Sequence, residues 1–413
     1  MKKKLAIVQL ARHREPALLV VGQSISNLGD GVALVALTLL VLDTTNNNAA
    51  KLAWFVAARM IPMVAFMLIG GAIVDRFSRR LLLLFSDGAR AVLTGGLVVL
   101  IGTGSLRFWE LMVFGVLFGS FDAIFMPAIS AITPEIVPED LLGAMNAVRP
   151  LSNSLMGNMI GPALGGLIAV TSTSWAIGVD CATFVFSAAT LTMMRPTAAP
   201  VRETETSMLE DIRGGISYVR TTRWLWTTLV AVTFVNAFVF SPMPVLIPYF
   251  LRHDLHSSKV LVGYAFAISG LAGAIGALIA SNLQVPARRV RSMWTYWTIG
   301  TVAALIMGVA SNYWEVLLVF AIASPMMLFG NVIWESMMQS EVPRELLGRT
   351  SSVDWFVSLG LAPLGLVVAG QLVNVVGVRT YFTMSALVTM IPGLWILLSP
   401  RINEIDTKRV REQ

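Results

Sequence analysis

The sequence predicts an all-α integral membrane protein in which twelve transmembrane helices form two six-helix bundles. Of its 413 residues, 56% are hydrophobic and only 13% are charged, whereas soluble domains carry about 25% charged residues. Twelve apolar runs are each long enough to cross a bilayer. A seven-residue motif also recurs after the fourth run of each half. Composition, run length and repetition therefore predict the same architecture.

The twelve apolar runs divide evenly around a polar segment. The first six cover residues 16–42, 52–74, 81–104, 110–133, 142–170 and 175–194. The second six cover residues 224–250, 260–284, 292–310, 315–339, 349–376 and 380–400. We therefore predict an N-terminal bundle over 1–194, a cytoplasmic linker over 195–223, and a C-terminal bundle with its tail over 224–413.

The first apolar run follows a basic start, as the core of a signal peptide would. It is too long for a signal peptide, it contains Gln23, Asn27 and Asp30, and no small-residue cleavage site follows it. We therefore expect this run to be the first membrane helix.

The distribution of basic residues predicts the orientation of the chain in the membrane. An even number of helices brings both termini to one side, and that side carries 22 Lys and Arg residues against 5 on the other. Basic loops mark the cytoplasmic face, so we expect both termini in the cytoplasm. The net charge of +6 is concentrated in short turns. It therefore reflects membrane topology and gives no reason to expect a nucleic-acid partner.

The linker is expected to contain a short amphipathic helix on the cytoplasmic surface. Residues 196–206 are rich in Pro, Thr and Glu, and the segment 207–210 has a capping-box pattern. Apolar residues then recur at helical spacing, at Leu209, Ile212, Ile216 and Val219. Such a helix fits either a brace between two moving halves or a passive connection.

The repeated motif predicts two homologous halves. The segment VPEDLLG at 137–143 recurs as VPRELLG at 342–348, which is 205 residues later, with five of seven positions identical. Gly71 matches Gly276 at the same offset. Each copy of the motif lies between the fourth and fifth runs of its half, as expected for a duplicated unit.

Motifs for hydrolysis, group transfer or metal binding are missing from the sequence. It has no G-x-S-x-G elbow, no P-loop and no cluster of metal ligands. Cys181 lies inside an apolar run, and the three histidines (His13, His253 and His256) lie near predicted helix ends. We expect no cofactor, no metal and no enzymatic activity. Any transport would draw on an ion gradient or on the solute gradient itself.

Acidic residues lie within three predicted membrane helices: Asp30, Asp122 and Glu335. A charge at membrane depth costs about 2.5–3.5 kcal/mol, so such residues face a water-filled cavity or a partner. Burial favours the protonated carboxyl, and a carboxylate that alternates between a proton and a cationic substrate would couple the two fluxes. A structural ion pair with Arg59, Arg90 or Arg149 is the alternative.

The loop between the second and third runs carries a dense charge pattern. Its pattern G-x-x-x-D-R-x-x-R-R over 71–80 resembles the loop 2–3 signature of the major facilitator superfamily of transporters, with Ser78 where that family usually has glycine. The resemblance implies that this loop latches the two halves, with Asp75 beside the start of helix 11 near Arg349. The implied latch residues are Gly71, Asp75, Arg76, Arg79 and Arg80. An ordinary positive-inside loop is the alternative.

The fifth run carries a second family-like pattern. Residues 157–166 read G-x-x-x-G-P-x-x-G-G, in which glycines four apart allow close helix packing and the proline bends the helix. This pattern resembles the antiporter signature of the drug-exporting branches of the superfamily, which implies export in exchange for protons. Its residues are Gly157, Gly161, Pro162, Gly165 and Gly166.

A further combination of residues in the first half is similar to that of the bacterial macrolide and enterobactin exporters of the superfamily. They are Arg59 and Pro62 in the second run, Ser86, Asp87 and Arg90 in the third, and Pro127 and Pro134 in the fourth. The resemblance implies a monomer in the bacterial inner membrane that exports drugs or siderophores by alternating access as protons enter. The fourth run lacks the arginine of many such antiporters, which moves the expected coupling role to Asp122 or Arg149.

The resemblance also implies a central substrate cavity lined by helices 1, 4, 7 and 10. The candidate lining residues are Gln23, Asn27, Phe121, Phe125, Asn236, Phe240, Asn331 and Trp334. An aromatic cavity with few polar groups suits small amphiphilic substrates, and 21 methionines supply adaptable side chains. Three alternatives stay open: an importer of a nutrient, a facilitator without proton coupling, and a membrane enzyme or scaffold.

Overall fold

The structure is a computed structural model of the chain. It describes residues 9–10, 12–74, 77–138, 141–195, 208–282, 286, 288–399 and 406. All the elements in these ranges are helices. Within them, twelve segments are long and apolar enough to cross a membrane. This confirms the predicted number of spans and the all-α fold class.

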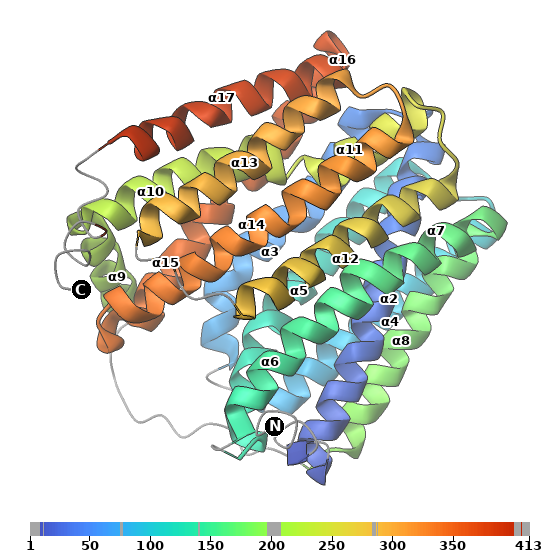
Figure 1. Cartoon of the computed structure of the whole chain (residues 1–413). Helices are drawn as coiled ribbons and strands as arrows, with labels where there is room; N and C mark the ends of the chain where they lie inside the picture. The colour runs from blue at the N-terminus through green and yellow to red at the C-terminus, as the bar shows by residue number, and fades with distance from the viewer. Residues whose placement is uncertain are drawn as a thin grey trace. The chain divides into compact units, whose positions relative to one another are not determined.

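The chain forms two compact units (Figure 1). Unit 1 comprises Met1–Glu203 and His256–Leu271, and unit 2 comprises Thr204–Leu255 and Ala272–Gln413. The predicted bundles over 1–194 and 224–413 stay a prediction, because the units divide by packing and assign the first part of α12 to unit 1.

Unit 1 contains the first six spans. Its elements are α2 (Arg14–Thr44), α3 (Ala49–Val74), α4 (Arg79–Gly102), α5 (Phe108–Ile136), α6 (Leu142–Ser152), η2 (Asn153–Ile160), α7 (Gly161–Thr171) and α8 (Thr173–Met193), joined by the start of α12 (Lys259–Asn282). Helix α8 packs against both α2 and α4, and α5 packs against α3. Five helices, α2, α3, α4, α5 and α8, therefore meet around one polar interior, described below.

Unit 2 contains the remaining elements of the chain. They are α9 (Met208–Thr221), α10 (Arg223–Val235), η3 (Asn236–Phe240), α11 (Met243–His253), α13 (Arg289–Val309), α14 (Tyr313–Glu341), α15 (Arg344–Gly360), α16 (Ala362–Val376) and α17 (Val378–Leu398). Helix α13 packs against α14 and α17, and α15 packs against α9 and α10. Helix α9 lies in the segment predicted to be the linker, and its Val219 is buried in the core of unit 2. The cytoplasmic linker itself stays a prediction.

Prolines produce a π-helical turn in one span of each unit. Pro162 follows η2 and Pro242 follows η3. A proline has no N–H and its ring collides with the carbonyl group four residues earlier, so the backbone there shifts to i→i+5 bonding. The N–H of Gly161 accordingly donates to Met156 O, and that of Ser241 donates to Asn236 O.

The two copies of the repeated motif have the same structural role. Val137 ends α5 and Val342 ends α14, both with extended backbone and both buried. Each valine precedes a proline, and a residue before proline is disfavoured in the helical region, which stops the helix there. The duplicated sequence therefore marks the same corner in each unit.

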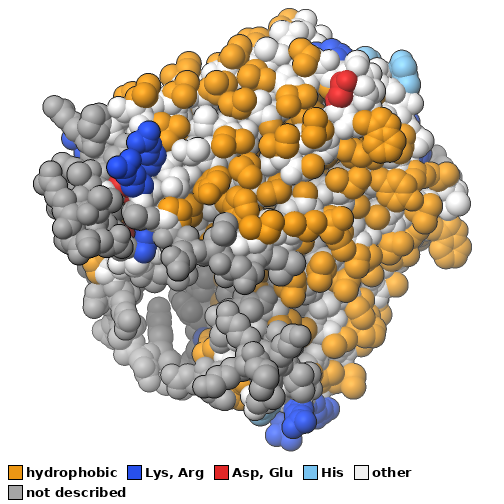
Figure 2. All heavy atoms as spheres, viewed as in Figure 1, with side chains coloured by type: hydrophobic (Ala, Val, Ile, Leu, Met, Phe, Trp, Pro, Cys, Tyr) orange, Lys and Arg blue, Asp and Glu red, His pale blue; other side chains and the backbone are white. Residues whose placement is uncertain are grey.

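Large apolar side chains lie on the outside of the helices, as expected for contact with lipid. Val92, Val309, Trp314 and Val375 are each at least 74% exposed. Figure 2 shows hydrophobic side chains spread over the visible face, with Lys and Arg at its margins. Helices satisfy their own backbone groups and can face hydrocarbon in this way.

Candidate functional site

Asp122 lies in the interior of unit 1 between two arginines. Arg59 Nη2 on α3 donates to Asp122 Oδ2 at 2.9 Å, and Arg59 Nε donates to the same oxygen at 3.1 Å. Arg90 Nη1 on α4 donates to Asp122 Oδ1 at 3.3 Å. The structural ion pair considered for Asp122 is thus formed by Arg59 and Arg90, and each carboxyl oxygen is bound.

Asp87 extends this network toward α2 and α8. Its Oδ1 is ion-paired with Arg90, one turn away on α4, and its Oδ2 accepts a hydrogen bond of 2.6 Å from Ser187 on α8. Gln23 on α2 donates to Ser187 Oγ at 3.2 Å. The predicted cavity residue Gln23 is therefore linked to the buried charges.

Aromatic rings surround the two guanidinium groups. Arg90 Cζ lies 4.1 Å from the ring centroid of Phe125 and 4.6 Å from that of Phe184, and Arg59 Cζ lies 4.4 Å from that of Phe118. Such contacts stabilise a cation by about 0.5–2 kcal/mol each. Phe125 thus supports the charge network of unit 1.

Two further aspartates, Asp30 and Asp180, lie beside this network. Asp30 on α2 is partly buried, and Asp180 on α8 is 1% exposed. Both interact electrostatically with Arg59, Arg90 and Asp122. Neither forms an ion pair within the described part of the chain. Asp180 was missed in the sequence, although an acid inside the apolar run 175–194 was a sufficient signal.

Arg149 and Phe121 lie outside the charge network. Arg149 on α6 donates to Thr133 Oγ1 on α5 at 3.3 Å, and Phe121 packs edge-on against Phe85 with centroids 5.6 Å apart. The coupling role expected for Arg149 stays a prediction.

The motif of the fifth span lies along α2. A methyl group placed on Gly161 would lie 2.7 Å from Leu28 O, and one on Gly165 would lie 2.9 Å from Val32 Cα. A methyl group on Gly157 would lie 3.4 Å from the carbonyl oxygen of Asn27, another predicted cavity residue. The motif therefore brings two backbones closer than side chains allow.

Gly166 points to a different neighbour. A methyl group on it would lie 2.7 Å from Gly263 Cα at the start of α12. At the adjoining helix ends, Lys259 Nζ on α12 donates to Asp43 Oδ2 on α2 at 2.5 Å. Gly166 of the motif thus packs against the start of α12. The other three glycines, Gly157, Gly161 and Gly165, pack against α2.

Two arginines of the predicted latch contact other parts of unit 1. Arg80 donates to Leu191 O at 2.6 Å and to Thr192 O at 2.8 Å, at the end of α8, and Arg79 is ion-paired with Glu135. Asp75 and Arg76 lie outside the described residues, and Gly71 is described only as part of α3. The latch stays a prediction.

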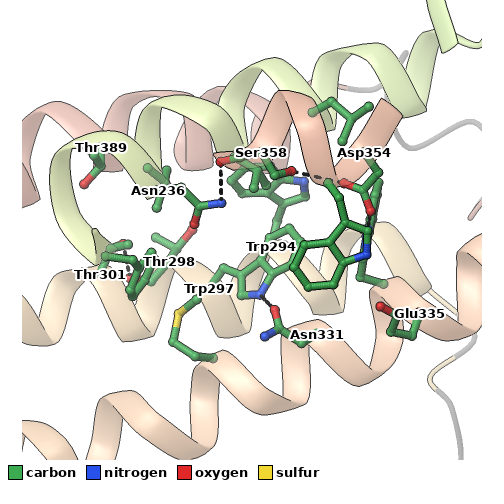
Figure 3. Close-up of a pocket in the computed structure, with 17 residues that line it drawn as sticks. Asn236, Trp294, Trp297, Thr298, Thr301, Asn331, Glu335, Asp354, Ser358 and Thr389 are labelled. Atoms are coloured by element: carbon green, nitrogen blue, oxygen red, sulfur yellow. Dashed lines mark hydrogen bonds between the residues drawn. The ribbon is translucent and has the colours of Figure 1, made fainter. Parts of the chain in front are cut away.

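A cavity of about 390 Å³ lies inside unit 2 (Figure 3). Four indole rings dominate its wall, those of Trp294, Trp297, Trp334 and Trp355. The other lining residues are Leu229, Val232, Val235, Asn236, Phe240, Thr298, Thr301, Met327, Asn331, Glu335, Asp354, Ser358 and Thr389. The cavity brings together the four candidates expected in the second half, Asn236, Phe240, Asn331 and Trp334.

Hydrogen bonds fix the orientation of the polar groups in this wall. Trp334 Nε1 donates to Asp354 Oδ2 at 3.0 Å, and Ser358 Oγ donates to Asp354 Oδ1 at 3.1 Å. Trp297 Nε1 donates to Asn331 Oδ1 at 3.1 Å. In Figure 3, Asp354 and Glu335 approach the indole rings from α15 and α14.

Two buried polar atoms of the cavity have no hydrogen-bond partner among the described residues. They are Trp294 Nε1 and Thr298 Oγ1. An unsatisfied buried polar atom costs about 1–3 kcal/mol, so a ligand that binds to it recovers that energy. None of the 17 lining residues is Lys, Arg or His. The cavity wall is thus aromatic and carries two acidic side chains, those of Glu335 and Asp354.

The sequence also matches a known protein family. The family model of the Major Facilitator Superfamily matches residues 19–357 and 232–412. The chain belongs to this superfamily. It is therefore a multi-pass membrane protein of a transporter family, as the loop and helix motifs implied.

Curated relatives match nearly the whole chain. Multidrug efflux pump Tap of Mycolicibacterium fortuitum is 29% identical, over 95% of this chain and 98% of its own length. Macrolide efflux protein A of Streptococcus pyogenes is 23% identical, over 93% of this chain and 95% of its own length.

Solved structures of other transporters share the fold. The nucleoside transporter NupG matches with a TM-score of 0.74 at 11% identity, over 92% of this chain and 97% of its own. A bacterial homologue of the iron transporter ferroportin, in an outward-facing state, matches with a TM-score of 0.62 at 16% identity, over 96% of this chain and 100% of its own. At these identities the likeness concerns the fold alone.

Proposed function

We propose that the protein is a secondary active exporter that moves small amphiphilic molecules out of the bacterial cell in exchange for protons. The names of the efflux relatives support export of drugs or macrolide-like compounds. The complete glycine and proline pattern of the fifth span supports antiport. In this proposal both termini are cytoplasmic and a monomer carries out the cycle.

The indole cavity of unit 2 is the observation that carries this proposal. Indole rings packed edge-on or tilted against one another, as Trp297 is against Trp294 and Trp334, offer apolar area without demanding one substrate shape. Glu335 and Asp354 favour a positively charged group, which the indole faces also attract. Trp294 Nε1 and Thr298 Oγ1 are buried in the wall, and they would bind an acceptor atom of the substrate only after the side chains around them move. A lipophilic molecule with one amine and one carbonyl or ether oxygen satisfies all these groups.

Proton coupling would rest on carboxylates at membrane depth. Asp30, Asp122 and Glu335 are the candidates, with Arg149 as an auxiliary charge. A substrate cation and a proton that compete for the same or linked carboxylates would exchange across the membrane as the halves rock about the central site. Asp75 would hold one end state by contacting the start of the eleventh span.

Transport by everted membrane vesicles tests the proposal. Vesicles that contain the full-length protein are energised and given lipophilic cationic dyes or macrolides, and accumulation inside is followed. We expect gradient-dependent accumulation that Trp297→Ala reduces about tenfold or more, because it removes a central wall of the cavity. Trp395→Ala is the matched control, since Trp395 is 56% exposed on the outside of α17.

Each outcome of the vesicle experiment has one meaning. Export that disappears with the proton gradient supports antiport, whereas export that persists without any gradient supports a facilitator. Gradient-driven movement in the opposite direction would establish an importer. Equal loss in Trp297→Ala and Trp395→Ala would remove the indole cavity from the transport path.

A further inference from the structure

Asp180 lies in the middle of α8, and its carboxyl group is deeply buried. Its side chain is 1% exposed, and neither carboxyl oxygen has a hydrogen-bond partner among the residues that the structure describes. The backbone of α2 closes one side, because a methyl group on Gly29 would lie 2.8 Å from Asp180 Oδ1. An ionised carboxylate here would be a buried charge without a donor, which is strongly unfavourable.

Charged groups face Asp180 from every neighbouring helix of the cluster. Asp30 on α2, Arg59 on α3, Arg90 on α4 and Asp122 on α5 all act on it electrostatically. Asp87 on α4 belongs to the same cluster through its ion pair with Arg90. These groups form one interacting set, and their charges must be considered together.

The set contains four aspartates but only two arginines. Arg59 and Arg90 are engaged by Asp122 and Asp87, the two acids with full sets of hydrogen bonds. Asp30 and Asp180 are the acids without a cation of their own. In a membrane interior two uncompensated charges are costly, and protonation removes that cost.

We propose that Asp180 and Asp30 form a two-proton site, with Asp122 and Asp87 as permanently ionised counterions of the arginines. With both carboxyls protonated, the interior of unit 1 is electrically neutral. Because the two acids lie in one electrostatic set, they release their protons as a coupled pair. This assignment rests on the proposed antiport, and it adds that two protons are carried in each transport cycle.

The packing of α2 on α8 links proton release to movement. Asp30 is partly exposed and Asp180 is buried behind the α2 backbone at Gly29, so a proton on Asp180 leaves past Asp30. Loss of that proton creates a charge which the present contact cannot stabilise. Water or an arginine must then approach it, and this requires α2 to shift against α8.

Infrared pH titration of the purified full-length protein in lipid nanodiscs tests the assignment without any substrate. The carbonyl stretch of protonated carboxyl groups is followed from acidic to alkaline pH. We expect two buried carboxyls to titrate in the wild type, one to disappear in Asp180→Asn, and the other to disappear in Asp30→Asn. Glu110→Gln, which changes a partly exposed acid at the start of α5, should leave the buried bands unchanged.

The stability of the variants gives a second readout. Since Asp180 is neutral in the proposed resting state, Asp180→Asn should keep the wild-type apparent Tm or raise it. Asp122→Asn should lower the apparent Tm, because it leaves two arginines facing one carboxylate. An Asp180→Asn protein that fails to fold, or that keeps both carboxyl bands, overturns the proposal. Loss of a carboxyl band in Asp122→Asn would also overturn it.

Failure of the proton site is distinguishable from failure of the proposed function. The titration reports proton binding even if the protein moves no dye. Transport in vesicles with an unchanged number of protons per substrate in Asp180→Asn would leave the exporter intact and remove Asp180 from coupling. A fall from two protons to one is the expected result.

Discussion

The two units have equivalent corners but different interiors. Unit 1 encloses charges, with Asp122 held between Arg59 and Arg90, whereas unit 2 encloses a cavity walled by indole rings. At the offset of the repeated motif, Asp122 of α5 corresponds to Met327 of α14, which lines the cavity. One ancestral helix position thus carries a charge in one unit and an adaptable apolar side chain in the other.

A second pair of positions shows the same divergence. Arg149 of α6 corresponds to Asp354 of α15 at the same offset. Arg149 contacts a threonine outside the charge network, while Asp354 is bound by two donors in the cavity wall. The two units thus share the corner at the repeated motif but differ inside, with a charge network in one and an aromatic cavity in the other.

The largest effect is expected where the charge balance of unit 1 is broken. Arg90→Gln removes the cation shared by Asp87 and Asp122 and the group that stacks on Phe125 and Phe184. Breaking a buried ion pair costs about 3–5 kcal/mol. We expect a large fall in apparent Tm in detergent. Arg107→Gln, at an exposed helix start, should change the apparent Tm little, and equal shifts would refute the buried network.

A smaller effect is expected at the glycine contact between α7 and α12. Gly166→Ala places a methyl group 2.7 Å from Gly263 Cα, and overpacking costs about 1–3 kcal/mol. Gly96→Ala in α4 is the matched control, because nothing lies within 4 Å of a methyl group there. Thermal unfolding of both variants should separate them. Because Ala favours a helix more than Gly does, Gly96→Ala should not destabilise the protein. Destabilisation by Gly96→Ala of the same size would mean that the contact with Gly263 is not the cause.

The negative charge of Asp354 should make the cavity of unit 2 bind cations more tightly than anions. Asp354→Asn keeps an oxygen to accept from Trp334 or Ser358 but removes the negative charge. We expect the Kd for tetraphenylphosphonium to rise about tenfold, which is about 1.4 kcal/mol, while binding of the near-isosteric anion tetraphenylborate does not weaken. Quenching of tryptophan fluorescence measures both. Equal weakening of both ions would indicate a change of shape only.

The smallest effect is expected at a helix end in unit 2. The Asp406 carboxylate accepts from the N–H groups of Val290 at 3.1 Å and Arg291 at 3.0 Å, and so caps the start of α13. Asp406→Asn keeps one acceptor but loses the interaction with the helix dipole, which is worth about 0.3–1 kcal/mol. We expect a small fall in apparent Tm that becomes smaller at high salt, because salt screens the interaction with the dipole. A fall of the same size at low and high salt would argue against the charge effect.

Helix ends and spans were predictable because their causes are local. The apolar runs alone located all twelve spans, and the valine–proline steps at 137–138 and 342–343 marked where α5 and α14 stop. Pro162 likewise predicted a bend in the fifth span, although not the π-helical turn. Such signals act over a few residues, so a sequence contains them in full.

Partners within the charge network were not predictable to the same degree. Asp122 lies 63 residues from Arg59 and 32 from Arg90, and only the packing of α3, α4 and α5 selects these arginines over Arg149. Asp180 and Asp354 lie inside the apolar runs 175–194 and 349–376, but the partners that give them their roles lie on other helices. The cavity tryptophans have no spacing that distinguishes them from those facing lipid, such as Trp314.

The π-helical turn η2 also sets the rotational phase of the fifth span. One extra residue in a turn rotates everything beyond it by about 100° relative to an uninterrupted α-helix. This offset lets Arg149 face α5 while Gly161 and Gly165 face α2. Removing one residue from Asn153–Ile160 would restore a continuous α-helix and turn the glycines away from their neighbour. The fifth span therefore tolerates many substitutions there more easily than a single deletion.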